Sequence, residues 1–312
     1  MIALSTAYNI SKHGTAQSLI AEIKELGFSA VELNVEVPAG FIPEIARELK
    51  IVSVHNFCPK VGYVPEGRTI YSPYNISSDG IDERELAIEL TKKTVDTAAD
   101  IGATAIVIHS GEVVTEFTGR MLAKIYNETK GANGYGKHLS EFLIKRQSKA
   151  KKYLDNVLSS LDDILNYSIK KNVKLGIENR FWANEIPSLE EMGTIFEKLS
   201  SEYIGLWYDT GHSVIAEKQG LVKSYVNYLE NFGNKLIGTH LHDVVDVYPH
   251  TNGQSIGVEV YDHKAPRTGK FDFKKISGYL NSRTLLVNET HPSATKEELM
   301  RSTEYLKSCG IV

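Results

Sequence analysis

A cluster of chemically active side chains follows the short apolar run IGLW at residues 204–207. The stretch WYDTGHS (207–213) places Asp209, Thr210 and His212 within four residues. Such groups are costly to bury without partners. They belong either to a polar turn or to a strand end that delivers metal ligands into a pocket. The ends of the other apolar runs distinguish these two interpretations.

Six apolar runs end in or near a residue that can bind a metal ion. These residues are His55, His109, Glu178, Asp209, His240 and Glu289. Taken singly, a histidine at a strand end is more often a hydrogen-bonded structural residue, and an acidic residue often caps the next helix. Six such ends together favour a metal site, because packed carboxylates and imidazoles are costly unless a cation compensates them.

Eight apolar runs rich in Val and Ile predict the strands that would carry these residues. They span residues 2–6, 29–34, 51–56, 103–109, 173–178, 204–209, 236–242 and 284–289. Near-continuous apolar runs are typical of strands covered on both faces, as in a parallel sheet. Helical spacing of apolar residues appears between the runs, over 15–27, 83–102, 148–171, 187–199 and 295–308.

This alternation predicts a (β/α)8 TIM barrel, with residues 1–312 as a single domain. The alternative is a doubly wound open sheet, but no G-x-G-x-x-G loop follows the first strand. The C-terminal strand ends of a barrel meet at one rim, where active sites lie. Long loops after strands 3 and 4, roughly 57–82 and 110–147, are expected to shape the pocket there. The second loop contains the glycine-rich segment GANGYG (131–136), which lacks the spacing of a phosphate-binding loop.

Composition and charge restrict the class of protein. A net charge of −4 and a pI of about 6.2 give no broad basic surface for nucleic acid. Two distant cysteines, Cys58 and Cys309, favour a reducing compartment over a disulfide framework. The N-terminus lacks the features of a signal peptide, and no apolar run approaches the ~20 residues of a membrane span. We therefore expect a cytoplasmic chain with no membrane or nucleic-acid partner; homo-oligomerisation is left open.

The innermost ligand set is expected at strands 5 to 8, whose ends are neighbours in a barrel. It consists of Glu178, Asp209, His240 and Glu289. Three carboxylates and one imidazole favour Mn²⁺, with Mg²⁺, Co²⁺ or Zn²⁺ as alternatives. A second layer is expected to hold the substrate or further metal, and comprises His55, His109, His212 and His263.

Several motifs resemble those of the xylose isomerase-like TIM barrels over nearly the whole chain. They are VELN (31–34), VHNF (54–57), IENR (177–180), WYDTGH (207–212), HLHD (240–243), DHKAPRTGKFDF (262–273) and VNET (287–290). This superfamily includes sugar isomerases, ketose 3-epimerases, inositol catabolism enzymes and endonuclease IV. The resemblance therefore implies one particular fold, but it does not imply one particular activity.

The resemblance implies a metal site at the same four residues: Glu178, Asp209, His240 and Glu289. In the epimerase-like members, the carboxylates matching Glu178 and Glu289 also form the acid–base pair. A histidine of a characteristic family segment matches His263, and Arg267 stands where a glycine is common in that segment.

Comparison with endonuclease IV, which uses three zinc ions, implies an incomplete three-metal site. Eight of its ligand positions match His55, His109, Glu178, Asp209, His212, His240, His263 and Glu289. A ninth, an aspartate two residues before the last histidine ligand, falls on Tyr261. The neighbouring Asp262 is expected to point elsewhere.

We predict a divalent-metal-dependent sugar isomerase or epimerase that transfers a proton through a metal-bound enediolate, with Glu178 and Glu289 as the acid–base pair. The small-molecule substrate is expected to contact His55, His109, Arg180, His212 and His263. An alternative role for Arg180 is to pair with Glu185. Alternative functions are a lyase or dehydratase acting on a keto-sugar or cyclitol, a phosphodiesterase acting on abasic DNA, and a barrel that binds a ligand without turnover.

Overall fold

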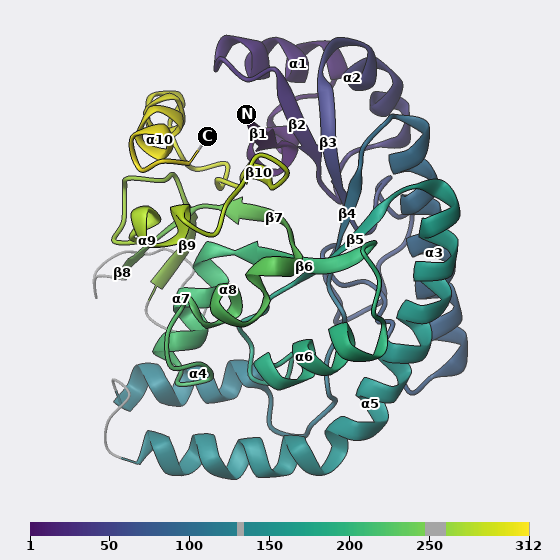
Figure 1. The fold of residues 1–312 in the computed structure, drawn as a ribbon, viewed down its shortest axis with the longest axis vertical. Helices are drawn as coiled ribbons and strands as arrows, with labels where there is room; N and C mark the ends of the chain where they lie inside the picture. Colours follow the sequence, from purple (N-terminus) through teal and green to yellow (C-terminus); the bar gives the residue numbers. More distant parts are fainter. Residues whose placement is uncertain (130–133, 247–259, 312) are drawn as a thin grey trace.

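Eight parallel strands close into a barrel in the computed structural model, which describes residues 1–129, 134–246 and 260–311 (Figure 1). The barrel strands are β1 (Ile2–Ser5), β2 (Ala30–Leu33), β3 (Lys50–His55), β4 (Ala105–Ile108), β5 (Lys174–Glu178), β6 (Ile204–Asp209), β7 (Leu236–Leu241) and β10 (Leu285–Asn288). Successive barrel strands are neighbours, and β1 pairs with β10 to close the ring. The predicted TIM barrel is therefore confirmed.

A tryptophan fills part of the barrel interior. Trp207 on β6 has no exposed surface, and it packs between glycines of the two neighbouring strands, Gly176 on β5 and Gly238 on β7. A methyl group at either glycine would collide with the indole ring. The ring of His240 lies edge-to-face with this indole, at 5.3 Å between centroids. Trp207 therefore supports the strand ends where the predicted ligands lie.

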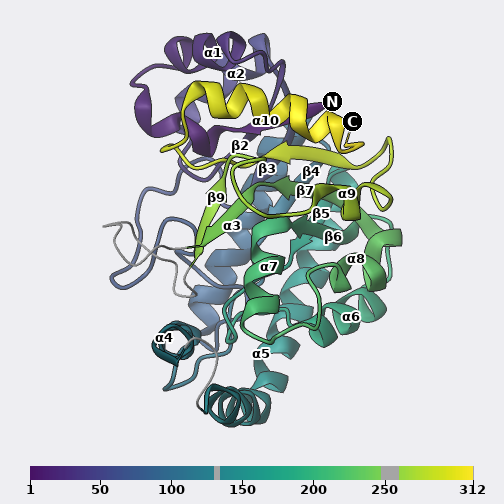
Figure 2. The same ribbon diagram turned by 90° about the vertical axis from the view of Figure 1, so that its left-hand side faces the viewer.

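The helices surround the barrel (Figures 1 and 2). They are α1 (Ala16–Glu25), α2 (Ile42–Glu48), α3 (Ile81–Asp100), α4 (Gly119–Thr129), α5 (Tyr135–Lys171), α6 (Leu189–Lys198), α7 (Thr210–Lys218), α8 (Asn227–Phe232), α9 (Phe273–Ser277) and α10 (Lys296–Ser308). Capping boxes begin two of the predicted helices, with Ser188 and Glu191 at α6 and Thr295 at α10. No described helix is long and apolar enough to cross a membrane.

The connection after β4 is long, as expected, but much of it is helical. It contains α4, and α5 begins at Tyr135, well before the predicted start at residue 148. Two edge-to-face aromatic pairs hold this connection together. Tyr126 of α4 contacts Tyr135 of α5, and Phe117, just before α4, contacts Phe142 of α5. Residues 131–133 of the glycine-rich segment lie outside the described part of the chain. The connection after β3 has no α-helix until α3 begins.

A two-stranded antiparallel sheet interrupts the path from β7 to β10. It consists of β8 (Asp243–Asp246) and β9 (Val260–Lys264), and the segment 247–259 between them lies outside the described residues. Asp243 organises the turn after β9, because its carboxylate accepts backbone N–H bonds from Arg267, Gly269 and Phe271 at 2.9–3.1 Å. This small sheet brings the 262–273 motif back to the barrel rim.

Candidate metal centre

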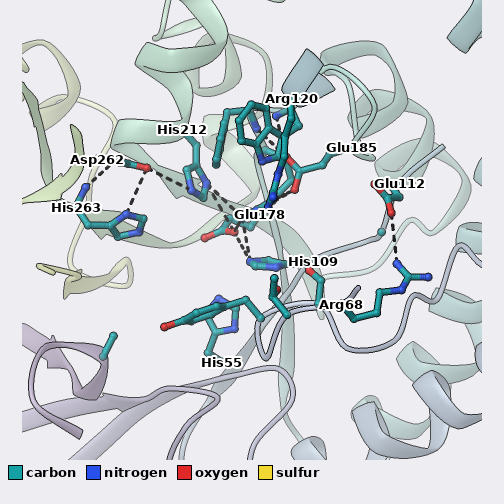
Figure 3. A pocket seen from close by; sticks show the side chains of 18 of the residues that line it. His55, Arg68, His109, Glu112, Arg120, Glu178, Glu185, His212, Asp262 and His263 are labelled. Atoms are coloured by element: carbon teal, nitrogen blue, oxygen red, sulfur yellow. Dashed lines mark hydrogen bonds and ion pairs between the residues drawn. The ribbon is translucent and has the colours of Figure 1, made fainter. Parts of the chain in front are cut away.

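A cavity of about 690 Å³ lies at the C-terminal ends of the barrel strands (Figure 3). Its lining includes residues at the ends of β3, β4 and β5, from the first turn of α7, from β9, and from the segment after β10. This is the rim at which the sequence predicts chemistry. The lining includes two of the predicted inner ligands and the ionisable residues around them: His55, His109, Glu178, Arg180, His212, Asp262, His263 and Glu289.

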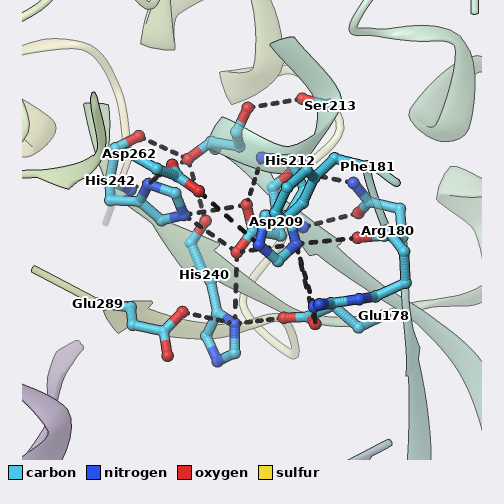
Figure 4. Close-up of polar contacts among 12 residues, drawn as sticks. Glu178, Arg180, Phe181, Asp209, His212, Ser213, His240, His242, Asp262 and Glu289 are labelled. Atoms are coloured by element: carbon cyan, nitrogen blue, oxygen red, sulfur yellow. Dashed lines mark hydrogen bonds and ion pairs between the residues drawn. The ribbon is translucent and has the colours of Figure 1, made fainter. Parts of the chain in front are cut away.

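The four predicted inner ligands meet at one point. Glu178, Asp209, His240 and Glu289 each offer one ligand atom within 4.8 Å of the others. Nδ1 of His240 lies 2.8 Å from Glu178 Oε1, 3.0 Å from Glu289 Oε2 and 3.6 Å from Asp209 Oδ2 (Figure 4). Glu289 directly follows β10, and the other three lie at or near the ends of β5, β6 and β7. We call these residues the four-residue group.

The other nitrogen of His240 contacts a carboxylate that the prediction did not include. Nε2 of His240 lies 2.9 Å from Oε1 of Glu32, which has no exposed surface. Oε2 of Glu32 accepts a hydrogen bond from the Ser53 hydroxyl at 2.7 Å. A histidine ligand commonly donates its second N–H to a carboxylate, which fixes the ring and its tautomer. The position of Glu32 in VELN, near the end of the second predicted strand, was the signal for it.

The stretch WYDTGHS forms a polar turn, and it also ends a strand with a predicted metal ligand, Asp209. Asp209 caps α7 by accepting the His212 N–H at 2.7 Å, and its own N–H donates to Asn179 Oδ1 at 2.7 Å. Glycine is required at position 211, because a methyl group there would collide with the side chains of Asp262 and His242. The local sequence therefore caps the helix and lets the side chains of His242 and Asp262 pack against Gly211 in its first turn.

His242 is a second polar residue that the prediction did not assign to the site. Its Nε2 lies 2.9 and 3.0 Å from the two carboxylate oxygens of Asp209. Its ring stacks on that of His263 at 4.1 Å between centroids. Burial lowers the pKa of His242, but the charges of Asp209 and Asp262 and the hydrogen bond to Asp209 together outweigh burial and raise the pKa to about 9. The sequence signal was HLHD (240–243), in which His240 and His242 lie two residues apart at the strand end.

A second group combines His55, His109 and Glu178. Nε2 of His109 lies 2.8 Å from Glu178 Oε2, and the His55 and His109 rings meet edge-to-face at 4.8 Å. Nδ1 of His55 donates to the backbone carbonyl of Asn56 at 3.1 Å. Burial, together with the neighbouring His109, lowers the pKa of His55 to about 3. His55 is therefore a neutral imidazole at physiological pH, as a metal ligand must be.

A third group combines His212, Asp262 and His263, and it corrects the expectation for Asp262. Oδ2 of Asp262 lies 3.3 Å from His263 Nδ1 and 3.8 Å from His212 Nε2 (Figure 3). Successive side chains of a regular strand point to opposite faces. His263 has a φ of +52°, in the left-handed region, which breaks this alternation. Asp262 therefore faces the pocket together with its neighbour.

Arg180 contacts Glu178, His109 and His212 on one side and Glu185 on the other. Its Nη1 lies 2.5 Å from Glu178 Oε2, 3.0 Å from His109 Nε2 and 3.4 Å from His212 Nδ1. Its Nη2 lies 2.9 Å from Glu185 Oε1, so the pairing expected as the alternative role is also present. The chain thus places a fixed positive charge within the site.

Both candidate acid–base carboxylates are ionised. Burial favours the neutral form of Glu178, but the charges of His109, Arg180 and His212 outweigh it and hold its pKa well below the usual value. Burial likewise raises the pKa of Glu289, yet His240, aided by His263, lowers it to about 2. Ionised carboxylates are the form that binds metal.

The donor set of the four-residue group fits a divalent cation. Its three carboxylates and one imidazole are almost entirely buried, and such a concentration of negative charge needs a compensating cation. Oxygen-rich sets of this kind suit Mn²⁺ and Mg²⁺, and the imidazole also admits Co²⁺ and Zn²⁺.

Two curated relatives carry no assigned function. The chain is 26% identical over 211 residues to the uncharacterized protein y4fM of Sinorhizobium fredii (strain NBRC 101917 / NGR234), covering 67% of this chain and 54% of that protein. It is 22% identical over 211 residues to the uncharacterized protein MJ1311 of Methanocaldococcus jannaschii, covering 64% of this chain and 61% of that one. The chain thus spans less than two thirds of each relative.

Solved structures of sugar epimerases share the fold. A D-tagatose 3-epimerase-like protein matches with a TM-score of 0.64 and 18% identity, covering 99% of this chain and 96% of the other. The 3-keto-D-glucoside 4-epimerase of E. coli matches with a TM-score of 0.67 and 15% identity, covering 99% of both chains. D-psicose 3-epimerase of Clostridium cellulolyticum H10, solved with D-tagatose, matches with a TM-score of 0.66 and 12% identity, covering 99% of both chains.

The match to a family described by its fold covers most of the sequence. This family, the xylose isomerase-like TIM barrels, matches residues 20–309. The barrel topology and the strand-end ligands described above agree with that assignment. The chain therefore belongs to the xylose isomerase-like TIM barrel family.

Proposed function

We propose that this chain is a divalent-metal-dependent sugar isomerase or epimerase, with Glu178 and Glu289 as its acid–base pair. The supporting observation is that both carboxylates converge with Asp209 on His240 Nδ1 at the wall of a deep cavity. Several proteins that share the fold are sugar epimerases. The cavity volume of about 690 Å³ lies within the range typical of small-molecule sites.

The four-residue group would hold the ion, preferably Mn²⁺, which when bound would polarise a carbonyl as a Lewis acid. Glu178 and Glu289 are both ionised, so either can remove the proton from the carbon beside that carbonyl. An isomerase needs only one of them to carry the proton to the neighbouring carbon, while a hydroxyl proton moves between the two substrate oxygens. An epimerase needs the second residue to deliver a proton to the opposite face.

The residues around the acid–base pair are proposed to bind the sugar. They are His55, His109, Arg180, His212 and His263, all of which line the cavity. The aromatic rings of Phe181 and Trp182, 4.7 Å apart, give one wall of the cavity an apolar face for the sugar ring. We also propose that the chain acts in the cytoplasm, in keeping with its two buried free cysteines.

Exchange of solvent deuterium into ketoses tests this proposal. The Mn²⁺-loaded protein should incorporate deuterium at the carbon next to the carbonyl of at least one ketose in a panel. Glu178→Gln and Glu289→Gln should each lower this rate by roughly 10²–10⁴-fold, because each loses a proton-transfer group. Glu112→Gln is the matched control, since Glu112 lines the cavity but belongs to none of the four candidate ligand groups.

Two outcomes would count against the proposal. No deuterium in any ketose, from protein shown to contain metal, would remove sugar proton transfer as the activity. Exchange at the wild-type rate in a folded Glu178→Gln or Glu289→Gln variant would remove that residue from the acid–base pair.

A second candidate, a multi-metal phosphodiesterase, is favoured by the position of Asp262. With Asp262 facing His212 and His263, the described residues supply a further ligand group, one of four overlapping groups around the cavity. Clustered metal ions are suited to phosphoester hydrolysis, because they stabilise both the attacking and the leaving oxygen. Cleavage of an oligonucleotide containing an abasic site by the Zn²⁺-loaded protein, together with no exchange into sugars, would select this candidate.

A further inference from the structure

The two carboxylate oxygens of Glu178 face different surroundings. Oε1 lies 2.8 Å from His240 Nδ1 and so belongs to the four-residue group. Oε2 lies 2.8 Å from His109 Nε2 and 2.5 Å from Arg180 Nη1. A second ion held by His55, His109 and Glu178 would need Oε2, which already accepts a charged hydrogen bond.

Arg180 also lies close to the other donor of that second group. Its Nη1 is 3.0 Å from His109 Nε2, the nitrogen that faces Glu178. A divalent ion would have to lie about 2.0–2.2 Å from both the carboxylate oxygen and the imidazole nitrogen. Guanidinium and ion would therefore compete for the same lone pairs and repel each other at short range.

The guanidinium is held in this position from its other side. Nε and Nη2 of Arg180 lie 3.0 and 2.9 Å from Glu185 Oε1. Oε2 of Glu185 accepts the backbone N–H of Trp182 at 2.8 Å, which anchors the carboxylate. The side chains of Arg180 and Glu185 are only 11% and 14% exposed, so moving the guanidinium away would break a largely buried ion pair.

Other arginines of the cavity are arranged differently. Arg68 pairs with Glu83 and Glu112, and Arg120 lies over the Trp182 ring, 5.7 Å from its centroid (Figure 3). The contacts of Arg68 and Arg120 are with residues outside the ligand groups, so Arg120 provides a matched control.

We propose that Arg180 takes the place of a metal ion at the His55–His109–Glu178 group, so that the protein binds its ion in the four-residue group and excludes one here. This inference rests on the proposed function, because it assumes that the four-residue group binds the catalytic ion. It makes Arg180 the residue that keeps this chain from assembling three metal ions, and so separates the two candidate functions.

Metal content per chain tests this inference, with Zn²⁺ as the probe because it accepts both imidazole and carboxylate ligands. After equilibration with Zn²⁺ and removal of free ion, Arg180→Gln should contain one more ion per chain than the wild type. Glutamine removes the charge but keeps a polar contact for Glu185. Arg180→Met gives a second neutral variant, and circular dichroism and thermal melting show which variants are folded.

Three further variants locate the additional ion. Adding His109→Gln to Arg180→Gln should return the metal content to the wild-type value, whereas His109→Gln alone should leave it unchanged. Arg180→Lys should stay at the wild-type count because it keeps a positive charge, and Arg120→Gln should do so because it does not touch the ligands.

The possible results separate this inference from the proposed function. Equal metal content in the wild type and in the folded Arg180 variants would overturn the role of Arg180 alone. Three ions in the wild type would also overturn it and would favour the phosphodiesterase. No ion in the wild type would contradict the proposed function itself, and this inference with it.

Discussion

At the scale of single residues, the site is defined by the partner that each imidazole nitrogen and carboxylate oxygen contacts. His240 lies between carboxylates on both sides, with Glu32 at Nε2 and Glu178 and Glu289 at Nδ1. The positions of the proposed ligand residues at the strand ends could be predicted, because each ends or follows an apolar run in the sequence, and their role as ligands stays a prediction. Glu32, His242 and Asp262 were not assigned, because their roles depend on contacts across the barrel or on one unusual backbone angle.

Asp262 shows why part of the site could not be predicted. In a regular strand, Asp262 and His263 would point in opposite directions. Only the left-handed φ of His263 turns both toward the cavity, and histidine does not specify that conformation in the way that glycine would. Arg267 also adopts a left-handed φ, +88°, at the position where the family resemblance led us to expect a glycine.

Glu32→Gln should weaken Mn²⁺ binding by roughly 10–100-fold, as loss of a carboxylate partner of a histidine ligand usually does. The physical reason is that the glutamine amide would no longer hold the His240 ring in the tautomer that protonates Nε2 and leaves the Nδ1 lone pair free for the ion. Isothermal titration calorimetry measures the change. Glu36→Gln is the control, because Glu36 lines the cavity and its carboxylate accepts a hydrogen bond from the Tyr71 hydroxyl, away from His240. Unchanged affinity in a folded Glu32→Gln variant would exclude this role.

At the scale of elements, the barrel depends on close contacts between neighbouring strands. The eight strands could be predicted, because buried parallel strands are apolar over most of their length. The helical part of the connection after β4 was missed. Its short helix α4 contacts α5 through Tyr126 and Tyr135, and Phe117 just before α4 contacts Phe142 of α5; local periodicity does not reveal such contacts. The β8–β9 pair was missed because its strands are separated by a long segment of chain.

Gly238→Ala should destabilise the protein by roughly 1–3 kcal/mol, the usual cost of overpacking a core. The added methyl group would collide with the Trp207 indole, which supports His240. Urea unfolding measures the difference. Gly278→Ala is the matched control, since nothing lies within 4 Å of the added carbon and φ is −66°. Equal stability of the two variants would mean that the Trp207 packing is not tight.

At the scale of the whole molecule, the barrel brings residues separated by more than 200 positions to one point. Glu32 near the N-terminus and Glu289 near the C-terminus both contact His240. Sequence patterns predicted this convergence because a closed parallel barrel places all its C-terminal strand ends on one rim. The extent of the domain over residues 1–312 and the state of assembly stay predictions.

Anomalous X-ray scattering from crystals of the Mn²⁺-loaded protein would test the central claim most directly. We expect a strong peak within coordinating distance of Glu178, Asp209, His240 and Glu289, and none between His55 and His109, where Arg180 supplies the charge. The absence of a peak at the four residues, in crystals whose solution protein contains Mn²⁺, would contradict the account.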